Sequence, residues 1–425
     1  MTPRERYRAF VAGERLDRLP YAFGGPRQST LAAWRRQGLG PEQERRFGSW
    51  VGADPWVGFG KLNCQPIPFF DVQILREEGN QREWIDEWGV RRIDAIRQPT
   101  AGFATRRYLE FPVKCLADFE AMRFRYDARS PERLIPQPGE NDRPTYNPDG
   151  YRVHHAGVAH NDPAHMARLN DGDAPTTLTV PGLYWTARDW AGFEGLSLLT
   201  ALEPACVHAM MEHWTQFIID LLDEPLSRVR IDQVILNEDM AYKHAAMLSP
   251  AMMREFMVPR YRRLYEFFKS KGVRAVIMDS DGHIGQIVPV FHAEAGVIDG
   301  VSPVEIASDN DPGDYLEAFP KLLLDGGIDK RELRFEKPQA RAEITRRYRQ
   351  AWRYGRYIPT VDHGVPPDVP LRAVLYLVEL GRGLAGGHGP FTFEPECRVE
   401  RELGPVETMF DPIVAILEAQ GGRYH

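Results

Sequence analysis

The sequence predicts a single α/β domain over residues 1–425, a (β/α)8 TIM-type barrel with an antiparallel insertion in its N-terminal part. Three observations lead to this fold class. From Thr176 onward, strand-like and helix-like segments alternate about every 20 to 40 residues, as parallel strands joined by outer helices require. The carboxyl ends of these strands are rich in polar residues. Residues 59–113 instead alternate apolar and polar positions between glycine turns, which is typical of an antiparallel meander.

Composition narrows the class of protein. The chain is 43% hydrophobic and 27% charged, and no run approaches the ~18 apolar residues that a membrane helix needs. The basic N-terminus lacks an apolar stretch of the secretory kind, so we expect a cytoplasmic protein without a membrane partner. A net charge of −7 argues against nucleic acid as a partner. The four cysteines show no C-x-x-C spacing, so we expect reduced, structural thiols.

The first β-loop-α unit is visible at the start of the chain. Thr2 and Glu5 form a capping box for a helix that ends near Gly13. Residues 19–23 predict a short strand, which a Gly-Gly-Pro sequence breaks before a helix through Trp34. In the meander that follows, we expect the tryptophans to be packing residues.

Residues 126–173 form the second insertion and the least regular part of the chain. This segment is rich in Pro, Asp, Asn, Gly and Arg, and it contains His154, His155, His160 and His165. Four histidines so close together raise the alternative of a metal site. Because their spacing matches no i, i+4 pair on an apolar helix face, we favour a lid over the pocket.

The repeating part of the chain predicts six further strands and seven helices. The strands are expected at residues 176–182, 233–239, 275–279, 296–305, 321–329 and 357–364. The helices are expected at residues 196–202, 205–222, 250–271, 284–293, 314–319, 341–353 and 371–383.

The strongest candidate site is the stretch AVIMDSDGH at residues 275–283. Asp279 and Asp281 are two residues apart at the end of an apolar strand, so on an extended backbone they point to the same side. Buried carboxylates need a metal, a proton or cationic partners. Other polar residues at strand ends are Asn237, Glu238, Asp239, Glu305, Asp325, Asp329, Asp362 and His363. Strand ends meet at one face of a barrel, so we expect one site. The alternative is that Asp279 bonds loop N–H groups and Asp281 caps the helix near residue 284.

Three residues are candidates for substrate binding. Arg27 follows the first strand, and Arg188 lies just past residues 176–182, where it could hold an anionic group. Tyr184, with Trp185, could form a stacking wall in the same loop. The alternatives are a surface role for Arg27, an ion pair of Arg188 with Asp189 or another acid, and core packing of the aromatic rings.

The chain resembles the uroporphyrinogen decarboxylase superfamily, which includes corrinoid-linked methyltransferases. The resemblance rests on MTPRERYRAFVAGERLDRLP, on NEDMAYK followed by SPAMMREFMVPRYRRL, and on HGVPPDVPLRAV. It spans nearly the whole chain except residues 126–173. It implies the barrel fold and a homodimer.

The departures from the family pattern bear on the reaction. Uroporphyrinogen decarboxylases carry an RQAGR loop, whereas this chain has GGPRQSTLAAWRR and keeps only Arg27, so uroporphyrinogen itself is not the expected substrate. The methyltransferase branch has an H-x-C pair and a later cysteine that bind zinc, and the matching positions here are Asp279, Asp281 and His363. The resemblance therefore implies an oxygen and nitrogen site for Zn, Mn or Fe, with Glu238 and His283 as further candidate ligands.

Three functions stay open on this basis. The first is a methyltransferase that demethylates a small substrate, using Asp279, Asp281 and Glu238 as catalytic groups, with a corrinoid protein as methyl acceptor. The second is a metal-free decarboxylase or lyase, in which Asp279 is a general acid and an arginine holds a carboxylate. The third is a barrel that only binds a ligand or partner.

Overall fold

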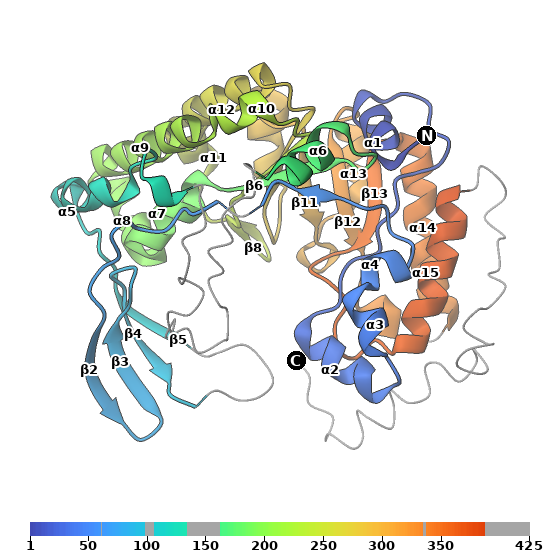
Figure 1. Ribbon diagram of the computed structural model, residues 1–425, viewed down its shortest axis with the longest axis horizontal. Helices are drawn as coiled ribbons and strands as arrows, with labels where there is room; N and C mark the ends of the chain where they lie inside the picture. The colour runs from blue at the N-terminus through green and yellow to red at the C-terminus, as the bar shows by residue number, and fades with distance from the viewer. Residues whose placement is uncertain (61, 98–105, 134–161, 335–336, 387–425) are drawn as a thin grey trace.

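A curled parallel sheet lies at the centre of the molecule. The computed structural model describes residues 1–60, 62–97, 106–133, 162–334 and 337–386 (Figure 1). Seven strands form the sheet in the order β1 (Val57–Gly58), β6 (Thr176–Pro181), β7 (Gln233–Asn237), β10 (Ala275–Asp279), β11 (Gly300–Val304), β12 (Leu323–Ile328) and β13 (Tyr357–Val361). All neighbouring strands in it are parallel. Each strand expected from residue 176 onward is present, and the arrangement is compatible with a TIM-type fold.

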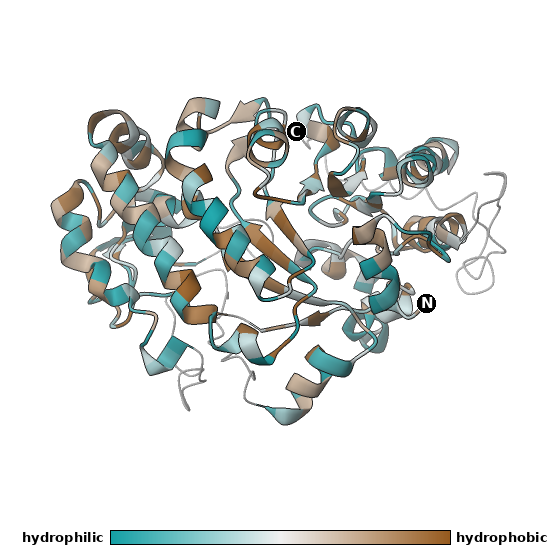
Figure 2. Cartoon of the chain, turned by 90° about the horizontal axis from the view of Figure 1, so that it is seen from above, coloured by the Kyte–Doolittle hydropathy of each residue, from teal (hydrophilic) through white to brown (hydrophobic). Residues whose placement is uncertain are grey.

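Helices flank the sheet, and the apolar strands lie between them (Figure 2). The longer helices are α8 (Phe193–Leu202), α9 (Pro204–Leu222), α12 (Val258–Ser270), α14 (Lys337–Tyr354) and α15 (Leu371–Gly386). The shorter elements are α10 (Pro225–Arg228), α11 (Pro250–Met252), η5 (Met253–Met257), η6 (Pro289–Glu294), η7 (Ile306–Ser308), α13 (Pro312–Ala318) and η8 (Glu332–Arg334). The helix predicted at 250–271 is confirmed as α11, a π-helical turn and α12 in succession. Within the described ranges, no helix has both the length and the apolar character needed to cross a membrane.

The N-terminal unit differs from the prediction in one respect. Helix α1 (Pro3–Ala12) has the expected capping box, and α2 (Gln28–Arg36) follows the Gly-Gly-Pro break. The residues between them form no strand ladder and make a single bridge, from Pro26 to Val365. They still run extended beside β13, because the Val361 N–H donates to the Phe23 carbonyl at 2.8 Å.

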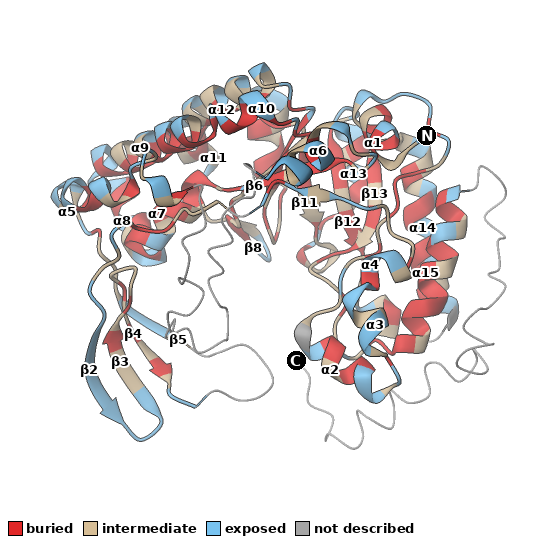
Figure 3. Cartoon of the chain, in the orientation of Figure 1, coloured by how far each residue is buried: buried red, intermediate tan, exposed pale blue. Residues whose placement is uncertain are grey.

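The antiparallel insertion is present as predicted. Strands β2 (Gln73–Glu78), β3 (Gln81–Ile85), β4 (Arg91–Ala95) and β5 (Arg106–Glu110) form one sheet. Strand β2 is exposed along its whole length (Figure 3). Trp84 is buried on β3 under the guanidinium of Arg92, in agreement with the expected packing role.

Several short elements were not predicted. They are α3 (Pro41–Arg45), α4 (Phe47–Trp50), α5 (Leu116–Met122), η1 (Arg123–Tyr126), η2 (Pro131–Arg133), α6 (Pro163–Asp171), α7 (Leu183–Ala191), β8 (Ala241–Tyr242) and β9 (Ala245–Ala246). Of the four clustered histidines, His154, His155 and His160 lie outside the described residues. His165 lies on α6, with its Nε2 atom 3.3 Å from the Phe59 carbonyl oxygen.

The expected loop after β6 is helix α7, and this corrects the prediction for residues 183–189. Its N-cap is Gly182, which has no side chain to satisfy the first N–H groups of the helix. The partner that does so comes from another strand, so no local capping signal is present in the sequence.

Candidate functional site

A row of polar side chains crosses the central sheet near the carboxyl ends of its strands. Asn237, Asp279 and Ser302 are direct partners in the parallel register of β7, β10 and β11, so their side chains share one face. The Ser302 hydroxyl donates to Asp325 Oδ1 on β12 at 2.7 Å. Met278, which points to the other face, is fully buried, whereas Asp279 is partly exposed. We call these four residues the polar row.

A second group, the mouth cluster, follows the ends of β10, β11, β12 and β13 by one or two residues. It consists of Asp281, Glu305, Lys330, Asp362 and His363. His363 Nε2 contacts the Asp281 carboxylate, and His363 Nδ1 lies 3.8 Å from Glu305 Oε1. Lys330 Nζ lies 2.7 Å from Asp362 Oδ1 and 3.8 Å from Glu305 Oε1. One ammonium group and one imidazole ring thus lie among three carboxylates.

The backbone after β13 places His363 in this cluster. His363 has a φ of 49°, in the left-handed region, and Gly364 follows with a φ of 82°. A Cβ atom at Gly364 would lie 2.5 Å from the Gly25 carbonyl oxygen, so only glycine permits this close approach. From the opposing loop, Arg27 Nε donates to the His363 carbonyl at 3.3 Å. The structure therefore places Arg27 beside the mouth cluster; a role in substrate binding stays a prediction.

Electrostatics single out Asp279 within the polar row. Burial raises the pKa of Asp279 to about 7, and the charges of Asp281 and Asp325 add to this effect. Burial also raises the pKa of Asp325 to about 6, opposed by the hydrogen bond from Ser302. Among the described residues, the Asp279 carboxylate has no hydrogen-bond donor, so the alternative in which it bonds loop N–H groups is not present. Asp279 can therefore hold a proton near neutral pH and release it.

In the mouth cluster, charge compensation dominates. Burial lowers the pKa of His363, but the contact with Asp281 and the charge of Glu305 outweigh it, so the pKa is raised. Burial raises the pKa of Asp362, and the Lys330 ammonium partly offsets this shift. Asp281 does not cap the turn near Ile284, whose N–H donates to Asn310 Oδ1 instead.

Glu238 lies apart from both groups, in a helix-capping position. Its side chain is fully buried, and its oxygens accept hydrogen bonds from the Leu183, Tyr184 and Trp185 N–H groups at 2.8 to 3.0 Å. The Tyr261 hydroxyl contacts the same carboxylate. Burial raises the pKa of Glu238 to about 7, and these hydrogen bonds oppose that shift. Three of the four contacts come from the first turn of α7 and the fourth from Tyr261 on α12, which is the geometry of a helix cap. A catalytic role for Glu238 stays a prediction.

Gly182 provides a direct test of this packing. A Cβ atom at Gly182 would lie 2.3 Å from the Glu238 Cδ atom. We expect Gly182→Ala to lower the free energy of unfolding by about 1 to 3 kcal/mol, because the carboxylate must move off the helix N-terminus. Urea denaturation followed by circular dichroism measures the change, with Gly195→Ala, which meets only a methyl group at 3.9 Å, as the control. Equal stability of the two variants would contradict the proposed packing.

Arg188 and Tyr184 are held within the fold on α7. Arg188 donates to the Asp239 carbonyl at 2.9 Å and pairs with Asp239 Oδ2 at 3.2 Å. Its guanidinium lies over the rings of Tyr184 and Trp185, and Tyr184 is buried. Of the alternatives open for Arg188, an ion pair with another acid is therefore present, and Tyr184 takes part in core packing.

The fold thus brings some of the predicted site residues together and separates others. Asp281 and His363 are in contact, Asp279 belongs to the adjoining polar row, and Arg27 lies beside them. His283 points Nδ1 to the Ser308 carbonyl oxygen at 2.9 Å. Lys330 was missed. It follows the strand end GGID, and considering cations as well as acids at strand ends would have found it.

Three residues of the mouth cluster have the geometry of a metal-ligand set. Glu305, Asp362 and His363 each offer one ligand atom, and these atoms lie within 4.8 Å of one another. The expected set of Asp279, Asp281 and His363 shares only His363 with this group. Asp281 instead contacts the other ring nitrogen of His363, as an outer-shell carboxylate does.

The fold and the polar strand ends define an α/β protein whose ionisable groups gather at one edge of a parallel sheet. Residues 185–384 match the model of the family Uroporphyrinogen decarboxylase (URO-D). This match confirms the resemblance to the uroporphyrinogen decarboxylase superfamily over these residues. The structure is similar to a methyltransferase from Methanosarcina mazei, with a TM-score of 0.53 and 14% identity over 89% of this chain and 97% of that one. No curated protein matches the sequence.

Proposed function

We propose that this protein is a methyltransferase-like enzyme that demethylates a small substrate and passes the methyl group to a corrinoid protein. The observation that carries the proposal is that Asp281 and His363 are in contact at the sheet edge and that Asp279 interacts electrostatically with both. These are the three positions that match the metal ligands of the methyltransferase branch. The family match and the methyltransferase neighbour support it through the fold.

The proposal includes a closed (β/α)8 barrel. On one side, residues 21–26 hydrogen-bond to Val361 on β13 and to Val365, four residues past the end of that strand. On the other side, the Asp54 N–H, just before β1, donates to the Tyr21 carbonyl at 2.8 Å. These bonds would make residues 21–26 the eighth strand position of the barrel, with the polar row lining the barrel interior.

A divalent metal fits the mouth cluster by donor chemistry. Glu305, Asp362 and His363 offer two carboxylates and an imidazole, which suit Zn²⁺, Mn²⁺ or Fe²⁺. A metal bound there would supply a Lewis acid for the substrate heteroatom. The chain itself does the remaining work. Asp281 orients the His363 ring, and Arg27 stabilises the backbone carbonyl that follows β13.

Asp279 supplies the proton that the reaction needs. When the bond between the methyl carbon and its heteroatom breaks, the heteroatom keeps the electron pair and the methyl group goes to the acceptor. A protonated Asp279 can transfer its proton to that heteroatom, which makes the demethylated product a better leaving group. Water and the substrate would reach Asp279 from the partly exposed face of the polar row.

The test is an assay for methyl transfer. The purified protein is mixed with chemically reduced cob(I)alamin and a panel of methylated amines, thiols and phenyl ethers. The absorption spectrum then reports methylcobalamin. We expect formation with one substrate class, and loss of it in the Asp279→Asn variant. An absence of methylcobalamin with every class would refute the proposal.

A decarboxylase or lyase is the second candidate, and one observation favours it. The carboxyl group of Asp279 has a pKa near neutral, and it interacts electrostatically with Asp281 and His363 of the mouth cluster. That cluster also contains the cation Lys330, and a proton donor beside a cation suits an anionic substrate and protonation of a carbanion. Release of labelled carbon dioxide from carboxylated substrates, at a rate that chelators do not change, would establish this reaction.

A further inference from the structure

Lys330 lies against the metal-ligand set of Glu305, Asp362 and His363. Its ammonium contacts Asp362 at 2.7 Å and approaches Glu305 to 3.8 Å, so it faces two of the three residues of that group. The Lys330 side chain is 17% exposed and that of Asp362 is 1% exposed. A buried carboxylate requires a cationic partner, and Lys330 is that partner in this structure.

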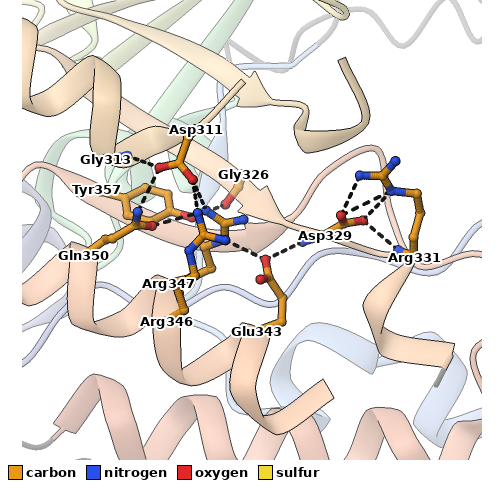
Figure 4. Close-up of polar contacts among 10 residues, drawn as sticks. All are labelled: Asp311, Gly313, Gly326, Asp329, Arg331, Glu343, Arg346, Arg347, Gln350 and Tyr357. Carbon is orange, nitrogen blue, oxygen red and sulfur yellow. Dashed lines mark hydrogen bonds and ion pairs between the residues drawn. The ribbon is translucent and has the colours of Figure 1, made fainter. Parts of the chain in front are cut away.

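The turn after β12 directs Lys330 into this position. Asp329, the preceding residue, is buried, and its N–H donates to Glu343 Oε1 on α14 at 3.0 Å. Glu343 is in turn paired with the buried Arg347 at 2.6 Å (Figure 4). On the other side, the Asp329 carboxylate accepts from the Arg331 backbone and guanidinium at 2.7 to 3.2 Å. With both flanking residues anchored, Lys330 is presented to the cluster by the backbone.

A divalent metal and the ammonium cannot occupy the cluster together. Both need the Asp362 carboxylate, and two cations a few ångströms apart repel each other strongly in a partly buried site. The metal can replace the Lys330 ammonium group in the cluster, because a lysine side chain has four rotatable bonds and can turn out into solvent.

We propose that Lys330 is an internal cation that competes with a divalent metal for Glu305, Asp362 and His363, and so sets the affinity of the site. The metal binds when the ammonium leaves. The inference rests on the metal site of the proposed function, and it adds the device that controls its occupancy.

Metal binding by the chelator-treated, full-length protein tests the inference directly. Mn²⁺ and Zn²⁺ are titrated calorimetrically into the wild type and into Lys330→Met and Lys330→Gln, two neutral variants. We expect both variants to bind at least about tenfold more tightly than the wild type, because the competing charge is gone. Lys330→Arg keeps the charge and should stay within about threefold of the wild type. Lys321→Met removes an exposed lysine and serves as the matched control.

The location of the gain is checked with double variants. Adding Asp362→Asn or His363→Ala to Lys330→Met should abolish the increase in metal affinity. Unchanged or weaker binding in folded Lys330→Met and Lys330→Gln, or a gain that survives loss of His363, would overturn the inference. Its failure would leave methyl transfer in the cobalamin assay intact. Conversely, tighter metal binding without methyl transfer would refute the proposed function alone.

Discussion

Replacing Asp279 by Asn is expected to lower the rate of methyl transfer about 100- to 10,000-fold, the usual range for the loss of a general acid. The amide has the same shape but cannot give up a proton. In the wild type, activity should fall as the pH rises above about 7, because the pKa of Asp279 lies there and the carboxyl loses its proton. The measurement is the pH profile of turnover in the cobalamin assay. Full activity of the variant would contradict the role of Asp279.

The same substitution should have the opposite effect on stability. The pKa of Asp279 rises from an unfolded value of 3.8 to about 7, so the folded state binds the proton more tightly and stability falls as the pH rises through this interval. Asp279→Asn removes that loss. We expect its free energy of unfolding at pH 8, with chelator present, to exceed that of the wild type by about 2 kcal/mol, and to match it near pH 4.

The control for Asp279→Asn is Asp314→Asn, which makes the same chemical change at an exposed position. It should change neither turnover nor the pH dependence of stability. A loss of turnover in Asp279→Asn together with lower stability at pH 8 would indicate misfolding and would argue against the role of a general acid.

Replacing Glu238 by Ala should cause the largest loss of stability, about 3 kcal/mol or more. The substitution removes the acceptor of the Tyr184 and Trp185 N–H groups at the start of α7 and of the buried Tyr261 hydroxyl. The Leu183 N–H also loses its bond to Glu238 and keeps only the Tyr261 oxygen at 3.3 Å. It also removes a negative charge from the N-terminus of a helix. Urea denaturation at pH 7.5, followed by both circular dichroism and tryptophan fluorescence, measures the loss.

Two further variants separate the structural role of Glu238 from a catalytic one. Tyr261→Phe removes only one of its contacts and should cost about 1 kcal/mol. Glu266→Ala, at an exposed position on α12, should cost far less than Glu238→Ala. If Glu238→Ala were as stable as the wild type but inactive, Glu238 would be a catalytic group, as the sequence had suggested.

The parallel strands and their polar ends follow from local pattern. An apolar run such as residues 275–278 must be buried, and the acids behind it must lie at its carboxyl end, so Asp279 and Asp281 could be placed at the sheet edge without coordinates. The capping box of α1 and the antiparallel insertion are equally local. Helix α7 lacks such a signal, because its first N–H groups are satisfied by Glu238, 55 residues along the chain from Leu183.

AVIMDSDGH by itself therefore determined where the ionisable groups gather, since the period of a strand fixes which side chains share a face. Only the tertiary structure decided which groups are paired. In the structure, Glu238 accepts hydrogen bonds from the start of α7, and Lys330 forms an ion pair with Asp362. Asp279 has no hydrogen-bond donor among the described residues. The physical reason is that ion pairs and hydrogen bonds depend on the distance between two groups in the folded chain. Periodicity along the chain carries no information about that distance.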